Sequence, residues 1–310
     1  MKKHLAILLA LKKHYLEGDT ALPQDAEYGF WSLKKLIAIN YLIPQFGRLA
    51  RTGNFTHCYY LDVLAGSGLV KLENDTTIPG SAIVALAAPT TEPHFEKYFF
   101  IERDPSKSDL LKKRLKRVAE TTDREYEVMA GDCNAVLPGI LNAIYKSDQE
   151  HTCFLALFDP EGYSETVWST VESLLAHGKG DLIFNFTEGI ARNVEKARTD
   201  PSYLPSLQRY FGESDNDWLQ CDGYDRLIDH FSYRLGHVNE IRRTTFRIDV
   251  RGEDNRPLYA LLIATGSSGY ANIVNDLKKR LDVIEVRDLK STYDQLVGKS
   301  RSIDSYGGLL

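Results

Sequence analysis

Two patterns of hydrophobic positions alternate along the chain between residues 57 and 187. Short apolar runs that end in polar residues predict buried strands over 57–66, 97–104, 125–132, 153–162 and 180–187. Between them, apolar positions three and four residues apart predict helices over 79–88, 106–121, 135–146 and 164–178. The helix at 106–121 is expected to be amphipathic and capped near Ser106. Such alternation with short connections predicts a mostly parallel sheet with helices on both faces.

Helices are also predicted before this alternation. Residues 30–49 carry apolar side chains at helical spacing, and Pro44 is expected to end or bend that helix. The first residues combine a basic start with an apolar stretch of about seven residues. Because that stretch runs directly into Lys12 and Lys13, we expect an amphipathic helix and no signal peptide.

Residues 188–240 have a different composition. They are polar and rich in aspartate, serine and aromatic residues, with Pro201 and Pro205 as breakers, which predicts short helices and loops over the sheet. Two further strands are predicted over 244–250 and 257–265, with the turn-like residues 251–256 joining them as a hairpin.

Together these elements predict one α/β fold, a Rossmann-like, doubly wound, seven-stranded and mostly parallel sheet. A chain of 310 residues with 43% hydrophobic content can bury the large core that this fold needs. The predicted parts are an N-terminal helical cover (1–57), an α/β core (58–187), a helical insert (188–240), and C-terminal strands and a helix that complete the core (241–310).

Composition narrows the functional classes. The net charge of −5 argues against a protein coated in positive charge for non-specific nucleic-acid binding, although basic runs occur at 111–117, 241–247 and 277–280. Solvated faces of helices and strands are the simpler explanation of these runs. No apolar stretch is long enough to span a bilayer. The four cysteines show no CxxC pairing and the eight histidines no metal-ligand spacing, so we expect neither a disulfide framework nor a zinc site, and a cytoplasmic location.

Acidic residues stand at the ends of four predicted strands. Asp62 precedes a turn that contains two glycines, Glu102 ends the second strand, Asp132 follows the third and Asp159 ends the fourth. Ligands of open parallel sheets bind outside the carboxyl ends of the strands, so these acids are expected to face one site. One acid at a strand end is weak evidence, because acids also cap helices, but four such acids predict a binding edge.

A nucleoside that carries a cationic sulfonium amino acid suits this set of acceptors. Asp62 would hold the ammonium group directly or through water, Glu102 would accept both ribose hydroxyls, and Asp132 would accept from the adenine amine. Glycine at positions 66 and 68 lets the backbone approach the ligand closely. A dinucleotide is the competing ligand, but its fingerprint needs glycine or alanine where this chain has Lys71.

The same residues resemble the class I S-adenosylmethionine-dependent methyltransferases, and more narrowly the three-Cys-motif partner family. The motifs that carry the resemblance are "YLDVLAGSG", "PGSAIVAL", "FFIERD", "GDCN", "FDPEGY", "DLIFNFTEGI" and "PLYALLIAT". The resemblance implies a sheet of the class I methyltransferase type with an antiparallel strand near the C-terminus, S-adenosylmethionine as cofactor, and a companion protein with a three-cysteine motif. The implied cofactor-binding residues are Asp62, Ala65, Gly66, Ser67, Gly68, Glu102, Asp132 and Cys133.

The end of the fourth strand carries the candidate catalytic residues Asp159, Pro160, Glu161 and Tyr163. Amino-methyltransferases that act on nucleobases have an acid or amide, two prolines and an aromatic residue here, which bind the target amine and stack on an extruded base. Asp159 and Pro160 match this pattern, whereas Glu161 replaces the second proline and Tyr163 stands one position late. Glu161 is either a general base or an acid at a helix start, and Tyr163 either stacks on a base or packs at the helix start.

Several other positions near this edge allow more than one role. Residues 69–80 delay the helix after the glycine turn until about Ser81 and form either a lid or a surface loop. Asn185 is expected to bridge strands and Glu188 to cap a helix. The tryptophans at 31, 168 and 218 are expected to pack in the core rather than to contact substrate.

Two functions are therefore predicted as alternatives. One is a methyltransferase that modifies a nucleic-acid amine, and the other is a non-catalytic methyltransferase-fold partner that binds cofactor or nucleic acid and assists a three-cysteine-motif protein. If nucleic acid is the substrate, basic residues are expected to rim the cleft, from the set Lys112, Lys113, Arg242, Arg243 and Arg247.

Overall fold

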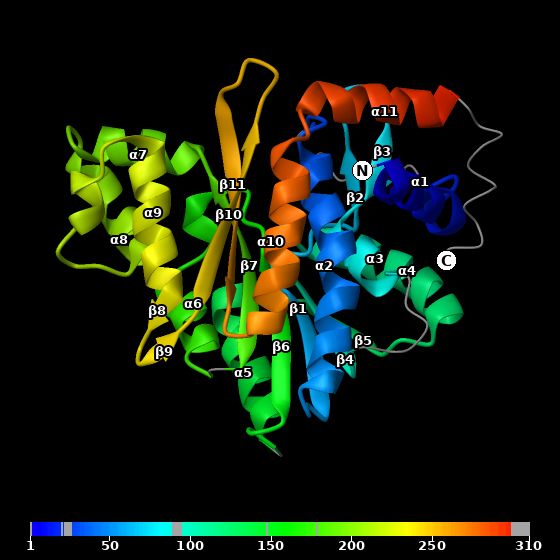
Figure 1. Cartoon of the computed structure of the whole chain (residues 1–310), viewed down its shortest axis with the longest axis horizontal. Helices are drawn as coiled ribbons and strands as arrows, with labels where there is room; N and C mark the ends of the chain where they lie inside the picture. Colours follow the sequence, from blue (N-terminus) through cyan, green and yellow to red (C-terminus); the bar gives the residue numbers. More distant parts are fainter. Residues whose placement is uncertain are drawn as a thin grey trace.

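A seven-stranded sheet forms the centre of the molecule (Figure 1). The computed structural model describes residues 2–19, 21, 27–88, 95–146, 148–177 and 179–298. Across the sheet the strands follow the order β10 (Thr244–Arg251), β11 (Pro257–Thr265), β7 (Gly180–Thr187), β6 (Thr152–Phe158), β1 (His57–Asp62), β4 (Lys97–Glu102) and β5 (Tyr126–Ala130). The predicted end of the chain at 299–310 lies outside the described residues.

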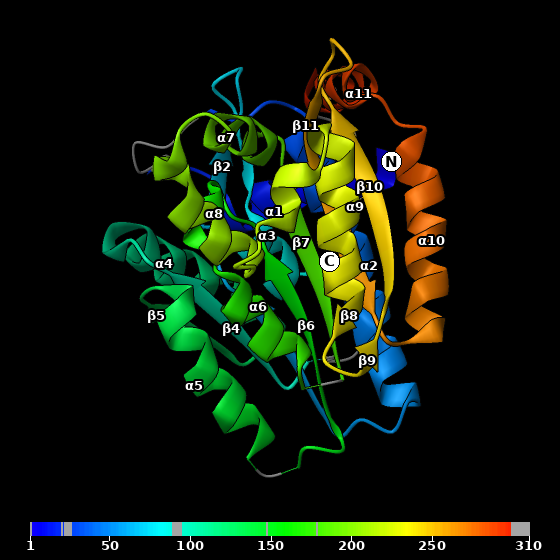
Figure 2. The ribbon, with the colours of Figure 1, turned by 90° about the vertical axis from the view of Figure 1, so that its left-hand side faces the viewer.

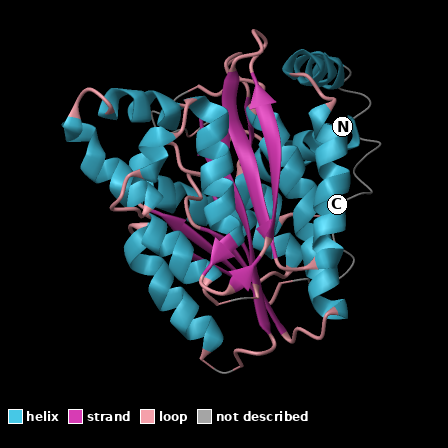
Figure 3. Ribbon diagram, turned by 60° about the vertical axis from the view of Figure 1, so that its left-hand side comes forward, coloured by secondary structure: helices cyan, strands magenta, loops and turns pink. Residues whose placement is uncertain are grey.

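Strand direction confirms the predicted sheet type. The pairs β1–β4, β1–β6, β4–β5 and β6–β7 are parallel, whereas β11 is antiparallel to both β7 and β10. The sheet is therefore mostly parallel, of the class I methyltransferase type, and its one reversed strand, β11, is the one expected near the C-terminus. The turn of the β10–β11 hairpin projects beyond the neighbouring helices (Figure 3).

Helices cover both faces of the sheet, as α5 and α10 on opposite sides show (Figure 2). One hydrophobic core is shared by α1 (Lys2–Leu16), α2 (Ser32–Thr52), α3 (Ser81–Leu86), α4 (Pro105–Thr122), α10 (Ser268–Asp282) and α11 (Val286–Gly298). The other is shared by α5 (Cys133–Tyr145), α6 (Trp168–Leu175), α7 (Gly189–Ala197), α8 (Leu204–Phe211) and α9 (Gly223–Gly236). Alternate residues of each central strand enter the two cores, because side chains of a strand point to opposite faces.

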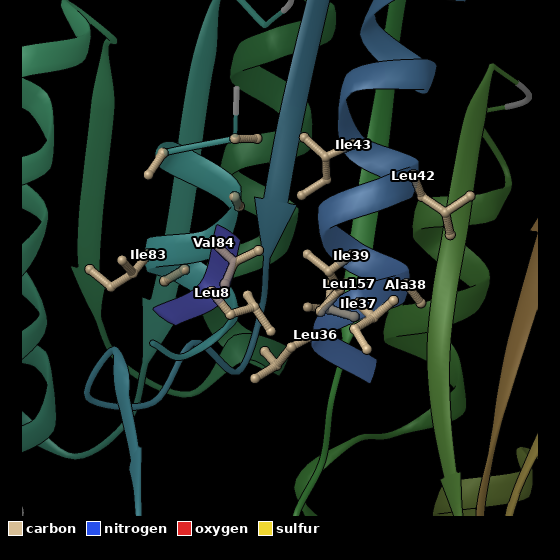
Figure 4. Close-up of a cluster of buried hydrophobic side chains, with 14 of the residues drawn as sticks. Leu8, Leu36, Ile37, Ala38, Ile39, Leu42, Ile43, Ile83, Val84 and Leu157 are labelled. Carbon is tan, nitrogen blue, oxygen red and sulfur yellow. The ribbon is translucent and has the colours of Figure 1, made fainter. Parts of the chain in front are cut away.

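The N-terminal cover is part of the first core. Figure 4 shows Leu36 and Ile39 of α2 beside Val84 of α3 and Leu157 of β6, and all of these side chains are buried. Full burial of one such aliphatic side chain contributes about 1.5–3 kcal/mol. The N-terminal cover is therefore packed firmly on the sheet, and the position of α2, including its N-terminal end, is fixed by this packing.

The structure makes three sequence predictions about these helices more specific. Of the two alternatives expected at Pro44, an end or a bend of helix α2, the first is wrong, because the helix continues through Pro44 to Thr52 with buried side chains before and after the proline. Helix α1 is buried on all sides from Leu5 to Leu11, so it is less amphipathic than expected. Helix α4 is capped near Ser106 as predicted, and the capping residue is Asp104, whose carboxylate accepts the backbone N–H of Ser106 at 2.7 Å.

The connections fill the remaining space with short elements. Residues 69–80 form a hairpin of β2 (Leu69–Lys71) and β3 (Thr77–Pro79), and α3 begins at Ser81 as predicted. The insert predicted at 188–240 is helical, with α7, α8 and α9 joined by the 3-10 turns η2 (Pro201–Tyr203) and η3 (Asp217–Gln220). A further 3-10 turn, η1 (Tyr163–Glu165), precedes α6, and β8 (His237–Val238) pairs with β9 (Ile241–Arg242). Among the described residues, no helix is long and apolar enough to cross a membrane.

Candidate active site

A cavity of about 660 Å³ lies at the carboxyl ends of the parallel strands. Strand order reverses beside β1, which pairs with β4 on one side and with β6 on the other, and ligands of open α/β sheets bind at such a reversal. The volume is in the range of small-molecule and cofactor sites. Ten of the twelve predicted site residues line it: Ala65, Gly66, Ser67, Gly68, Glu102, Asp132, Cys133, Asp159, Pro160 and Glu161.

The glycine turn after β1 forms one wall of the cavity. Gly66 and Gly68 have φ angles of +63° and +81°, a region that other residues enter only with strain. The backbone of Gly68 also packs tightly, because a Cβ atom on it would lie 3.0 Å from the Leu111 side chain of α4. Gly66 lines the cavity, and a Cβ atom on it would meet no atom within 4 Å. The turn is thus packed against α4 at Gly68 and has free space beside Gly66.

Glu102, at the end of β4, ties this turn to the next strand. Its carboxylate accepts the backbone N–H of Gly66 at 2.9 Å and that of Asp104 at 2.7 Å. Burial raises the pKa of Glu102 above its usual value, and the two backbone donors oppose that shift. A carboxylate has about four acceptor positions, so Glu102 can hold the turn and still accept two hydroxyl groups of a ligand.

Asp132 and Cys133 line the cavity beyond β5. Asp132 caps α5 and accepts the backbone N–H of Asn134 at 2.9 Å. The Cys133 thiol is buried, and burial raises its pKa to about 12. The thiol is therefore neutral near pH 7, which does not favour a role as a nucleophile.

Asp62 is fully buried and is not among the residues that line the cavity, whereas residues 64–68, shortly after it in the chain, do line it. Burial raises the pKa of Asp62 to about 7, although the Ser81 hydroxyl and the Leu64 backbone N–H act in the opposite direction. Among the described residues, neither of its carboxylate oxygens has a well-aligned hydrogen-bond partner. A buried carboxyl group without such partners is costly unless a donor or a cation reaches it.

At the other end of the cavity, Asp159 is held from both sides. Lys35 of α2 forms an ion pair with one carboxylate oxygen, and the Asn185 side-chain amide donates to the other at 2.7 Å. Asn185 thus bridges β7 and the end of β6, as predicted. Next to Asp159, Glu161 accepts a hydrogen bond from the Tyr28 hydroxyl.

Two predicted residues have other contacts. Tyr163 is not among the lining residues, and its hydroxyl lies 3.0 Å from that of Ser206 while its ring meets Tyr210. These contacts favour packing over base stacking. Glu188 precedes α7 but makes no side-chain cap, and pairs instead with Arg192 at 3.1 Å.

The predicted basic rim is wrong, and its absence counts against a nucleic-acid substrate bound through these residues. None of Lys112, Lys113, Arg242, Arg243 and Arg247 lines the cavity. Arg243 is buried at the opposite end of the sheet, where it donates to the carbonyl oxygens of Gly180 and Leu175. Arg247 pairs with Asp225 and Asp249. The cations that do line the cavity are Lys35, Lys71, Arg103 and Lys107, beside the acids Glu102, Asp104, Asp132, Asp159, Glu161 and Glu165.

Sequence reasoning missed the contribution of the N-terminal cover. The cavity is also lined by Tyr28, Trp31, Ser32, Lys35 and Leu36. Trp31 packs against the core, as predicted, and in addition faces the cavity. The only available signal was a lysine pair, at 34 and 35, inside an otherwise apolar helical pattern.

Comparisons with known proteins add little to this geometry. No family model and no curated protein matches the sequence. A crystallised protein of Legionella pneumophila is similar at 14% identity and a TM-score of 0.43, over 79% of this chain and 92% of that one. An O-methyltransferase of Bacillus cereus in complex with SAH has 11% identity and a TM-score of 0.38, over 82% and 99%. The small RNA methyltransferase HEN1 has 12% identity and a TM-score of 0.40, over 79% and 27%. With TM-scores this low, the fold assignment rests on the strand order.

Proposed function

We propose that the protein binds S-adenosylmethionine in this cavity and transfers its methyl group to an amine held beside Asp159. The observation that carries the proposal is a single cavity whose lining runs from the glycine turn, past Glu102 and Asp132, to Asp159. A cofactor site and an acceptor site therefore share one space, as a direct transfer between two bound molecules requires.

The residues at the end of the cavity formed by the glycine turn, Glu102 and Asp132 fit the cofactor. The Asp62 carboxyl, which has no well-aligned partner among the described residues and does not itself line the cavity, suits an ammonium group bound through water. Glu102 would accept the ribose hydroxyls, and Asp132 the adenine amine. Ala65, Ser67 and Cys133 would contact the ligand with backbone atoms and small side chains, because the open space in front of Gly66 allows close approach.

At the other end of the cavity, Asp159 would hold the amine that accepts the methyl group. Its carboxylate is oriented by Lys35 and Asn185, and its remaining lone pairs can accept an N–H of the target amine. When bound, S-adenosylmethionine supplies an electrophilic methyl group, so that an N–CH₃ bond forms as the S–CH₃ bond breaks, S-adenosylhomocysteine is left, and the surplus amine proton passes to Asp159 and then to water. The main contribution of Asp159, Pro160 and Glu161 is position, because oriented reactants need no further ordering before the reaction.

Asp159 also gives the test of catalysis. Asp159→Ala is expected to leave S-adenosylhomocysteine binding nearly unchanged and to lower transfer of radiolabelled methyl to nucleic acid by at least about a hundredfold. Asp109→Ala, an exposed acid on α4, is the control and should have no effect. Separate assays on DNA, RNA and protein acceptors identify the class of substrate. Equal transfer by Asp159→Ala and the unmutated chain would contradict the assigned role.

One observation favours a second function, a non-catalytic partner of a three-cysteine-motif protein. Both carboxylate oxygens of Asp159 already accept hydrogen bonds from the protein, so the Lys35–Asp159–Asn185 set also makes sense as structure alone. This alternative predicts cofactor binding without methyl transfer, even after addition of the companion protein. Cofactor binding together with transfer that depends on Asp159 would exclude it.

A further inference from the structure

The first turn of α2, which precedes the predicted α/β core in the chain, forms part of the cavity wall around Asp159. We infer that Trp31 is a stacking platform for an unpaired nucleobase, whose exocyclic amine Asp159 then holds. The inference rests on the proposed function and names its substrate class. It also moves the stacking role from Tyr163, which packs elsewhere, to the N-terminal cover.

Trp31 and Lys35 lie on one face of the helix. Trp31 is the N-cap residue of α2 and Lys35 follows four residues later, a spacing that places both side chains on the same side. Both line the cavity, and the Lys35 ammonium pairs with Asp159. One helical turn therefore presents a flat ring and a direct link to the carboxylate that would bind the amine.

The indole is held in place by a glycine. A Cβ atom on Gly29 would lie only 1.8 Å from Cζ3 of Trp31, so the ring packs against the bare backbone at this position. Any other residue at position 29 would displace the ring. The Trp31 side chain is partly exposed and faces the cavity, so contact with Gly29 leaves ring surface for a ligand.

Hydrogen bonds fix the backbone around the ring. The Tyr259 hydroxyl of β11 donates to the Trp31 carbonyl oxygen at 2.8 Å, and the Ser32 hydroxyl donates to the Gly29 carbonyl oxygen at 2.9 Å. Tyr259 also lines the cavity. The platform is thus ordered before a ligand binds, which reduces the entropic cost of stacking.

A nucleobase is the ligand that uses all of these groups together. Its ring would stack on the indole, a contact that contributes about 1–3 kcal/mol per base in single-strand complexes, while its exocyclic amine would donate to Asp159. An aliphatic amine could use the carboxylate and, when charged, lie over the ring, but it would not cover the flat indole surface as a stacked base does. A base in a duplex would first have to leave the stack, so an unpaired base is the form that this site accepts most easily.

The test uses the full chain saturated with S-adenosylhomocysteine and short single-stranded oligonucleotides as probes. Trp31 is the partly exposed tryptophan of three, since Trp168 and Trp218 are buried, and its fluorescence should report ligand binding. Oligo(dA) and oligo(dC) are expected to quench the emission, whereas an abasic oligonucleotide of equal length and charge is not.

Two substitutions at one position separate stacking from folding. Trp31→Leu keeps an apolar side chain without a ring face and should weaken oligonucleotide binding, followed by anisotropy of a labelled oligonucleotide, about 5- to 150-fold. Trp31→Phe keeps a ring and should retain most of the affinity. Tyr233→Ala, which removes an exposed aromatic side chain on α9, is the control and should have no effect.

The possible failures are distinguishable. If S-adenosylhomocysteine binds but the abasic and base-containing oligonucleotides bind equally well, or not at all, or if Trp31→Leu binds like the unmutated chain, the platform is refuted and the cofactor site stands. If S-adenosylhomocysteine itself does not bind, the proposed function is refuted first.

Discussion

Replacing Asp62 by asparagine should change how the stability of the protein depends on pH. Asp62 is fully buried at the end of β1, and burial raises its pKa from 3.8 to about 7. In the unfolded chain the carboxyl group ionises near its usual value, so between these two pH values the folded protein binds the proton more tightly. The free energy of unfolding should therefore fall as the pH rises from about 4 to about 7. Asparagine has a similar shape and no proton to lose.

The size of the effect follows from the pKa difference. A shift of about three units corresponds to about 4 kcal/mol in total, of which about 3 kcal/mol falls between pH 5 and pH 8. Asp181, whose pKa burial also raises to about 7, adds a similar slope to both proteins. The difference in stability between Asp62→Asn and the unmutated chain cancels that slope and isolates Asp62.

Urea unfolding of both proteins without ligand, followed by circular dichroism at several pH values, measures this difference. The variant should gain about 3 kcal/mol relative to the unmutated chain between pH 5 and pH 8. A difference that does not change with pH would refute the claim that Asp62 is a buried acid without strong partners. The cofactor role adds a second signature, because a bound ammonium group favours the ionised carboxylate. Binding of S-adenosylmethionine at pH 6 should then release close to one proton, measured by calorimetry in buffers of different ionisation enthalpy.

Two further predictions concern the support of the glycine turn. Gly68→Ala should lower the free energy of unfolding by about 1–2 kcal/mol because of its positive φ. Gly139→Ala, within helix α5 and with open space around it, should raise the free energy of unfolding by about 0.5–1 kcal/mol. Urea unfolding measures both values, and equal effects of the two substitutions would contradict the geometry. Arg114→Met should cost about 3–5 kcal/mol and weaken S-adenosylhomocysteine binding, because Arg114 is buried, pairs with Asp19 and donates to the Ser67 carbonyl oxygen at 2.7 Å. Since the hydrogen bond from Arg114 lowers the pKa of Asp19, the stability difference between this variant and the unmutated chain should shrink as the pH falls below the usual aspartate value, and a difference that persists in acid would contradict the pairing.

The strands and the binding edge could be predicted from local patterns. The run at residues 153–158 is apolar at every position because both faces of β6 are covered. Once the strands are parallel, the acids that follow them must meet at one edge, so the positions of Glu102, Asp132 and Asp159 follow from topology.

The missed features depend on tertiary packing. Apart from the lysine pair at 34 and 35, nothing near Trp31 in the sequence shows that the start of α2 will line the cavity, because the place of α2 is set by burial against α3 and β6. The role of Gly29 could not be predicted either, because this glycine is required by contact with the Trp31 ring and not by a turn. The basic run at 241–247 misled for the same reason, because Arg243 donates to buried carbonyl oxygens at the opposite end of the sheet.

Titration of the full chain with S-adenosylhomocysteine by calorimetry tests the central claim most directly. The site predicts saturable binding at a single site, and a loss of at least about a hundredfold in affinity in Glu102→Ala, because two hydrogen bonds to a charged group contribute about 3 kcal/mol or more. Thermal unfolding of the variant confirms that it is folded. No heat above dilution at millimolar S-adenosylhomocysteine, or an unchanged dissociation constant in folded Glu102→Ala, would contradict the account.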